Sequence, residues 1–379
     1  MIYLDHNAST PVLPEVLEAM LPWLGPAAAN PSSAHPSGRA ARRAIEAARA
    51  QVAELIGASA DEIVFSSGGT ESSNLAIFGV APPWSPDGRA GVVTSAVEHP
   101  ATARPCDRLA ERGYRVTRLP VDARCVVDLE AARVAIDADT RLVTVMHANN
   151  ETGTLQPIAE LACLARAAGA LVHTDAAQSV GKVPVRVAEL DVDLLTVAGH
   201  KLYAPKGVGA LFVRRGVKLT PHTLGAGHER GVRPGTENTA FIVGLGAACE
   251  IASRSLDDEA ARQAALRDLL LTKLRGAISG VTVHGALAPR LPSTLYVSFT
   301  GANGAALLGR CVDVAASTGS ACHEGSERPS PVLTAMGIAH DEALGAVRLS
   351  LGRGTTEEDI VRAAEALATA YREVSARSS

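Results

Sequence analysis

The sequence predicts an α/β protein with a mixed, mostly parallel sheet and a second, smaller α+β domain. Between residues 62 and 213, short apolar segments alternate with segments of helical periodicity. Most of the strand-like segments are predominantly apolar, as in sheets that helices cover on both faces. After about residue 244 the pattern changes to a long helix rich in alanine, leucine and arginine, followed by scattered strands. A chain of 379 residues is long enough for two domains, and we place their boundary near residues 255–260.

The individual elements follow from apolar spacing and turn residues. A strand at 2–4 precedes a helix over 12–24, and Pro14 and Pro22 suit the ends of that helix. A loop at 30–35 leads to an amphipathic helix over 38–57. Strands are then expected at 62–65, 91–95, 115–119, 142–146, 170–174, 193–197 and 209–213, with helices near 70–80, 100–113, 128–138 and 157–169. The remainder predicts a helix over 242–279, strands near 293–299, 312–316 and 347–351, and a final helix from Thr356.

Composition excludes several classes of protein. The net charge of −4 lacks the basic excess of a nucleic-acid-binding protein, so we expect no DNA partner. No apolar stretch approaches the roughly 20 residues of a membrane span. The first residues lack a signal peptide's charged start and apolar centre, so a cytoplasmic location is expected. Six cysteines without a Cys-x-x-Cys pair argue against the usual zinc or redox sites and against a disulfide framework, and we expect no metal.

Lys201 is the first candidate catalytic residue. The chain has only five lysines, and this one follows the apolar run 194–197 and precedes the turn-forming pair Ala204-Pro205. A lysine at the end of a buried strand can be desolvated, which lowers its pKa and suits it to form a Schiff base. The alternative is a lysine whose side chain extends to solvent.

Polar residues follow several more of the predicted strands. Asp175 comes after Leu171-Val172, and a carboxylate there needs a partner; in pyridoxal phosphate enzymes an aspartate binds the pyridinium nitrogen. His99 follows the strand at 91–95, where an imidazole can stack on a planar cofactor, although a lone histidine is usually structural. Asn149-Asn150-Glu151 follows the strand at 142–146, which suggests a site or a turn.

Two loops favour ligand binding. Ser67-Gly68-Gly69-Thr70 lies between a strand and a helix, where backbone N–H groups favour a phosphate, although a plain tight turn explains it as well. It lacks the Gly-Lys-Ser/Thr of a Walker A sequence. The loop 225–238 holds four glycines, and a structureless stretch of this length is more often functional than filler.

Cys322 and Arg348 are the remaining candidates. Cys322 lies among small and polar residues, which favours a reactive thiol over a buried structural cysteine. Arg348 lies within the apolar run 347–351 and needs an anion, either a substrate carboxylate or a buried structural partner.

Together these stretches resemble the cysteine desulfurase family of pyridoxal phosphate enzymes. The matching runs are spread in order across the chain: Tyr3-Leu4-Asp5, Asn7-Ala8-Ser9-Thr10, Asn30-Pro31-Ser32-Ser33, Ser67-Gly68-Gly69-Thr70-Glu71-Ser72-Ser73-Asn74, Glu98-His99, Asn149-Asn150-Glu151-Thr152-Gly153, the run 173–182, Gly199-His200-Lys201, the run 233–238, Gly319-Ser320-Ala321-Cys322 and the run 348–353. The resemblance implies the class V aminotransferase fold, similar to aspartate aminotransferase, with a seven-stranded mixed sheet. It places the large cofactor-binding domain at 16–257 and the small domain, with the catalytic cysteine, at 1–15 and 258–379.

The resemblance also implies residue roles. Lys201 would bind pyridoxal 5'-phosphate covalently and move protons, Asp175 would pair with its ring nitrogen, and His99 would stack on the ring. Gln178 and Asn150 would hold the ring's phenolic oxygen and its surroundings. The phosphate would be held by Gly69, Thr70, His200 and, from the second subunit of a homodimer, Thr236. The substrate carboxylate would be bound by Arg348, Asn7 and Asn30. Cys322 would take sulfur from L-cysteine as a persulfide and pass it to an acceptor protein in iron–sulfur cluster assembly or tRNA thiolation.

Two features differ from the desulfurase pattern or are shared with another family, and they bear on cofactor binding and on the choice of substrate. Many desulfurases have serine where this chain has Ala198, so one phosphate hydrogen bond is expected to be missing. The runs around Cys322 and Arg233 are also similar to selenocysteine lyases, which contain the same cysteine. The sequence further allows a sulfur-relay or scaffold-binding subunit with little turnover of its own, and a class V relative that acts on a different amino acid.

Overall fold

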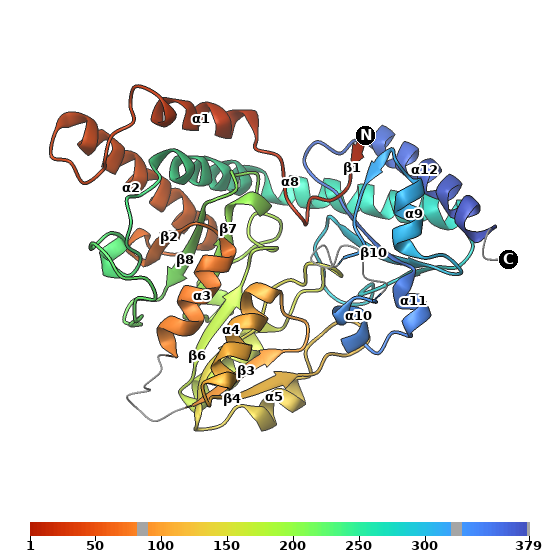
Figure 1. Ribbon diagram of the computed structural model, residues 1–379, viewed down its shortest axis with the longest axis horizontal. Coiled ribbons are helices and arrows are strands. Elements are labelled where there is room, and N and C mark those ends of the chain that lie inside the picture. Colours follow the sequence, from red (N-terminus) through yellow and green to blue (C-terminus); the bar gives the residue numbers. More distant parts are fainter. Residues whose placement is uncertain (82–89, 320–327, 377–379) are drawn as a thin grey trace.

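The structure is a computed structural model that describes residues 1–81, 90–319 and 328–376. In Figure 1 a long helix, α8 (Thr239–Ala277), runs across the upper part of the molecule and joins two parts of unequal size. The first strand, β1 (Ile2–Tyr3), lies in the smaller part, where Ile2 shares a hydrophobic cluster with Ile360 of the C-terminal helix α12 (Glu357–Ser375). Helices α1 (Pro14–Leu24) and α2 (Pro36–Ile56) belong to the larger part.

A seven-stranded sheet forms the larger part, in the order β2-β8-β7-β6-β5-β3-β4. Every strand is parallel to the others except β8, which is antiparallel to both of its neighbours. This confirms the predicted mixed, mostly parallel sheet. The strands are β2 (Ile63–Ser66), β3 (Gly91–Ser95), β4 (Arg115–Leu119), β5 (Thr140–Thr144), β6 (Leu171–Asp175), β7 (Leu194–Ala198) and β8 (Gly209–Val213).

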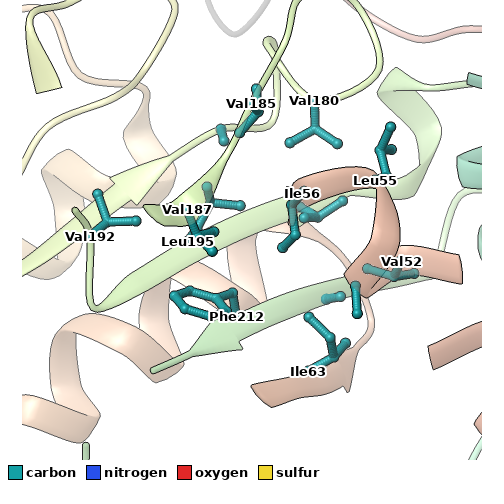
Figure 2. Close-up of a cluster of buried hydrophobic side chains, with 14 of the residues drawn as sticks. Val52, Leu55, Ile56, Ile63, Val180, Val185, Val187, Val192, Leu195 and Phe212 are labelled. Atoms are coloured by element: carbon teal, nitrogen blue, oxygen red, sulfur yellow. The ribbon is translucent and has the colours of Figure 1, made fainter. Parts of the chain in front are cut away.

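Helices cover both faces of this sheet because side chains alternate between the faces along each strand. Ile63 of β2, Leu195 of β7 and Phe212 of β8 pack on one face against Val52 and Ile56 of α2 (Figure 2). On the opposite face, the neighbouring strand residues Val64, Leu194 and Leu211 pack against α3 and α4. The helices of this part are α1 (Pro14–Leu24), α2 (Pro36–Ile56), α3 (Gly69–Val80), α4 (Pro100–Glu111), α5 (Leu129–Ala135), α6 (Ile158–Ala168) and α7 (Val187–Leu190), with 3₁₀ turns η1 (Ala60–Glu62), η2 (Gly199–Lys201) and η3 (Glu229–Gly231).

The smaller part is built on an antiparallel sheet in the order β12-β10-β9. Leu295 and Val297 of β10 pack with Leu270 of α8 and Leu367 of α12 in a separate hydrophobic cluster. A second, two-stranded sheet pairs β1 with β11. The elements are β9 (Val281–Val283), β10 (Thr294–Phe299), α9 (Gly304–Arg310), β11 (Val314–Ala315), α10 (Pro331–Ala335), α11 (His340–Leu344) and β12 (Ala346–Ser350). The separate clusters support our proposal of domains at 16–257 and at 1–15 with 258–379.

Helix α8 contributes to both cores. Leu245 and Ala252 belong to the cluster on the large sheet, whereas Leu274 belongs to that of the smaller part. By length and composition alone α8 could cross a membrane, contrary to our expectation that no stretch comes close. One such helix is weak evidence for a membrane protein, because the core helix of a globular protein passes the same test.

Candidate active site

The predicted polar residues meet at one edge of the large sheet. Because β2, β3, β5, β6 and β7 are parallel, their carboxyl ends lie at the same edge, which is where ligands bind in such sheets. Asp175 ends β6, Lys201 lies in η2 directly after β7, and His99 begins α4 after β3. These placements agree with the sequence prediction that each residue follows a strand.

The amine of Lys201 lies against the N-terminal segment of the chain. Its Nζ donates hydrogen bonds to the main-chain oxygens of Asn7 and Ala8, at 2.6 and 2.8 Å. The neighbouring Thr10 hydroxyl donates to the main-chain oxygen of His200 and accepts from the main-chain N–H of Tyr203. Residues 7–10 therefore form one wall around the lysine.

Asp175 and His99 are electrostatically linked to Lys201. Burial raises the pKa of the Asp175 carboxyl, and the positive charges of His99 and Lys201 oppose that shift. Burial also lowers the pKa of His99, whose Nδ1 accepts from the main-chain N–H of Ala101 and so caps α4. A cationic ring nitrogen bound next to Asp175 would stabilise its ionised form. The three side chains are thus suited to hold a planar ligand that carries positive charge.

Asn7 is the central hydrogen-bonding residue of the site. It is 1% exposed, and its Nδ2 donates to the main-chain oxygen of Asn150 and to the hydroxyl of Thr294, at 3.2 and 2.9 Å. The amide of Gln178 donates from Nε2 to the main-chain oxygen of Asn7 at 2.9 Å. Among the described residues the side-chain amide of Asn150 makes no hydrogen bond, which leaves it available to a ligand.

Arg348 is buried in β12 and paired with a carboxylate. Its guanidinium donates to Asp5 Oδ1 at 2.8 Å and to the main-chain oxygen of Asn150 at 2.9 Å, while its buried Nε has no partner in the described part of the chain. Two of the five N–H donors of an arginine are thus used. The sequence left open whether Arg348 binds a substrate carboxylate or a structural anion; the Asp5 pair shows the second, and the spare donors still allow the first.

The start of α3 fits a phosphate. Gly68 precedes the helix with φ of 148°, and no side chain caps the first turn. A Cβ on Gly69 would lie 3.1 Å from the Cβ of Ala198, so the helix start and the end of β7 are in close contact. The free N–H groups of a first helical turn bind anions, and glycine keeps the approach open. Thr70 is exposed at this end of the helix.

His200, also predicted to hold the phosphate, lies against the N-terminal segment. Its Nδ1 lies 3.3 Å from the Ser9 hydroxyl, and burial lowers its pKa to about 4. The outer side of that segment borders a cavity of about 530 Å³ lined by Tyr3, His6, Ser9 and Lys206, among others. Neither Lys201 nor Asp175 lines this cavity, so the chemistry predicted from the sequence lies elsewhere.

Three predicted residues are not brought to this edge by any described contact. Asn30 is exposed between α1 and α2, and its Oδ1 accepts from the main-chain N–H of Ser32. Thr236 is exposed on the loop that follows η3. Cys322 lies outside the described residues, which stop at Gly319 and resume at Arg328.

Sequence reasoning missed three polar residues that adjoin the site. Asp5 pairs with Arg348, Lys182 donates to Gln178 and Asn7, and Glu98 accepts from the main-chain N–H of Met146. Burial raises the pKa of Glu98 to about 8. All three residues lie in runs that resemble the desulfurases, and lysine is rare in this chain, but neither signal assigned them a role. Nothing in the sequence shows the pairing of Asp5.

Comparisons with known proteins show which family this chain resembles. The family model described as aminotransferase class-V matches residues 2–362. A cysteine desulfurase IscS of Dictyoglomus turgidum is 46% identical, over 95% of this chain and 91% of that protein. Another, of Anaeromyxobacter dehalogenans, is 47% identical over 95% of this chain and 89% of that protein.

Solved structures of similar proteins point to the same family. A NifS-like protein aligns with a TM-score of 0.90 and 36% identity, over 97% of this chain and 98% of that one. A NifS-like protein from Rickettsia africae aligns with a TM-score of 0.86 and 32% identity, over 99% of both chains. The fold, the residues at the carboxyl edge of the sheet and these likenesses together show that the chain belongs to the aminotransferase class-V family and, within it, to the cysteine desulfurases.

Proposed function

We propose that this protein uses pyridoxal 5'-phosphate to convert L-cysteine to L-alanine, with the sulfur atom transferred to Cys322. The observation that carries the proposal is the meeting of Lys201, Asp175 and His99 at one sheet edge. Family membership supports it, because the relatives that align over nearly the whole chain are named cysteine desulfurases.

The cofactor would be held by residues from several elements. Lys201 supplies the amine that binds it, Asp175 pairs with its ring nitrogen, and His99 stacks on the ring. Further contacts are expected from Gln178 and Asn150 at the ring and from Gly69, Thr70 and His200 at the phosphate, with Thr236 reaching it from the second subunit of a homodimer. When bound, the cofactor supplies an electron sink for carbanion chemistry at the substrate. The exposure of Thr236 supports a role outside its own subunit.

The chain's own residues would carry out the remaining chemistry. Arg348 binds the substrate carboxylate through its spare N–H donors, with Asn7 beside it and Asn30 completing the site, and Lys201 moves the proton at the substrate Cα. The Cys322 thiolate attacks the substrate sulfur, so that an S–S bond forms as the C–S bond breaks. The electron pair of the broken bond stays with carbon, which takes a proton and leaves as alanine.

The persulfide on Cys322 would then pass its outer sulfur to an acceptor protein. Iron–sulfur cluster assembly and tRNA thiolation are the processes that we expect to consume it, and we expect both enzyme and acceptor to be cytoplasmic. The names of the bacterial relatives support a desulfurase, and they do not identify the acceptor.

Alanine release from L-cysteine and from L-selenocysteine tests the proposal. Wild type should release alanine from cysteine, Cys322→Ala should lose that turnover while still binding the cofactor, and Lys201→Ala should lose both turnover and the covalent attachment of the cofactor. Robust release from selenocysteine with cysteine left intact would show a lyase and overturn the desulfurase proposal. Unchanged cysteine turnover in Cys322→Ala would remove that residue from the mechanism.

A further inference from the structure

Lys182 lies next to the proposed site, and no step of the proposed reaction uses it. It follows β6 in a tight turn, in which its main-chain N–H donates to the oxygen of Ser179. Gly181 has φ of 76°, and a Cβ there would lie 3.3 Å from Ala252 of α8 and from Leu202. The turn is therefore packed against the long helix, which fixes the direction in which Lys182 leaves the backbone.

The amine of Lys182 has two side-chain amides as its hydrogen-bond acceptors. Nζ lies 2.9 Å from Gln178 Oε1 and 3.3 Å from Asn7 Oδ1. Among the described residues it forms no ion pair. Burying a cation without a carboxylate partner costs free energy. We therefore look for a role of Lys182 that a neutral side chain could not fill.

An ammonium can only donate hydrogen bonds, so it determines which way each amide points. With its Oε1 turned to Lys182, Gln178 must present Nε2 to the main-chain oxygen of Asn7, at 2.9 Å. The same oxygen accepts from Lys201 Nζ at 2.6 Å. Lys182 is thus connected to Lys201 through Gln178, which shares the main-chain oxygen of Asn7 with Lys201.

The second amide extends the effect to the substrate side. With its Oδ1 turned to Lys182, Asn7 must present Nδ2 to the main-chain oxygen of Asn150, which also accepts from Arg348. If either amide were flipped, an NH₂ group would face the ammonium and oxygen would face oxygen. One lysine therefore sets the donor pattern on both sides of the site.

The surroundings of Lys182 act on its charge in two directions. Burial, followed by the positive charges of Lys201 and Arg348, lowers the pKa of Lys182 to about 7. The two amide oxygens that accept from its Nζ favour the protonated amine. A cavity of about 10 Å³ beside it is lined by His6, Glu259 and Arg353, among others. None of these forms an ion pair with Lys182.

We propose that Lys182 is a positioning residue that fixes the orientation of the Gln178 and Asn7 amides around Lys201. This rests on the proposed function, since Gln178 is expected to contact the cofactor and Asn7 the substrate. The role differs from that of a catalytic residue, because Lys182 would act through the two amides.

The test compares Lys182→Met, Lys182→Gln and Lys182→Arg with wild type and with Lys273→Met. Lys273 is an exposed lysine on α8, so its variant makes the same chemical change away from the site. The affinity of the apoprotein for pyridoxal phosphate is measured by titration, the pH dependence of the bound cofactor's visible absorption is recorded, and thermal unfolding is followed without cofactor.

Lys182→Met should weaken cofactor binding by about 10- to 100-fold, the usual effect of losing a hydrogen bond to a charged group, and should shift the pH dependence of the absorption. Lys182→Gln can both donate and accept, so it should leave the amides free to flip and behave like Lys182→Met. Lys182→Arg keeps a donor-only cation and should recover part of the affinity. Lys273→Met should match wild type.

The proposal is overturned if Lys182→Met changes thermal unfolding alone and leaves affinity and spectrum intact. It is also overturned if Lys182→Gln matches wild type. If Lys182→Met does not fold, the comparison of Lys182→Gln with Lys182→Arg still tests the proposal. None of these readouts needs cysteine turnover. If wild type binds the cofactor but releases no alanine from cysteine, the proposed function is wrong. The cofactor affinities and spectra of the Lys182 variants still test the positioning role.

Discussion

Glu151 Oε2 accepts a hydrogen bond from the hydroxyl of Ser330 at 2.5 Å, across 179 residues of sequence. Glu151 lies in the turn after β5 and is 5% exposed, whereas Ser330 caps the start of α10. A Cβ on Gly319 would lie 2.8 Å from the same carboxylate oxygen. Glu151 therefore contacts chain on both sides of residues 320–327, the stretch that contains Cys322.

Replacing Glu151 should slow sulfur transfer more than cofactor binding. Glu151→Ala removes the acceptor that holds Ser330, and a small misplacement of a reacting group can reduce a rate by up to about 100-fold. We expect a lower kcat for cysteine and less persulfide on Cys322, with cofactor content unchanged. Alanine release and mass spectrometry of the trapped persulfide would measure both. The exposed Glu160 of α6 provides the control, Glu160→Ala; equal effects from the two variants would contradict the prediction.

The pair Arg49–Glu229 should contribute strongly to stability. Both oxygens of the Glu229 carboxylate accept from the Arg49 guanidinium, at 2.7 and 2.8 Å, and the side chains of Glu229 and Arg49 are 2% and 4% exposed, respectively. Removal of one partner of a buried pair costs about 3–5 kcal/mol. The half-exposed Glu46, which also pairs with Arg49, would compensate only part of the charge left by Glu229→Ala. Urea denaturation of Glu229→Ala should show this loss in the free energy of unfolding. Asp61→Ala breaks an exposed pair with Arg215 and should change little; comparable losses in the two variants would refute the argument.

Glu98 should make stability depend on pH. Burial raises its pKa from 4.5 to about 8, against the hydrogen bonds from Ser95 and Met146. Between these values the folded protein holds a proton that the unfolded chain releases, so this contribution to stability is full below pH 4.5 and is lost as the pH rises through about 8. Glu98→Gln cannot titrate. The melting temperature of the Glu98→Gln apoprotein, relative to that of the wild-type apoprotein, should therefore rise from pH 5 to about 8. If the two melting temperatures change with pH in the same way, Glu98 does not titrate in this range.

Arg348 should govern the binding of cysteine. Arg348→Ala removes the donors expected to meet the substrate carboxylate, so KM should rise by about 10- to 100-fold with a smaller change in kcat. Steady-state kinetics would measure both constants. Arg310→Ala, an exposed residue of α9, serves as the control. An unchanged KM in Arg348→Ala would leave Arg348 with the structural role that its pair with Asp5 already shows.

Some features of the protein were evident from local sequence alone. The strands β3 and β8 were predicted with the observed bounds, because a strand covered on both faces is apolar along most of its length. The bounds of the edge strand β4 were also predicted, although it is polar and largely exposed. The predicted seven-stranded sheet is confirmed. Lys201, Asp175 and His99 could be identified because each follows such a strand. The short elements α7, β9, α9, α10 and α11 were missed, since they have too few residues to show a periodicity.

Only the tertiary structure decided which residues act together. Asn7 meets Lys201 across 194 residues of sequence and Arg348 meets Asp5 across 343, and no local pattern encodes such contacts. They arise because the N-terminal segment lies between the two parts of the molecule, where its backbone oxygens and side chains reach both. The sequence by itself determined the fold and the chemical types available at the sheet edge. The packing of distant segments determined how buried donors and acceptors pair, and through that pairing it gave Lys182 a place beside Gln178 and Asn7.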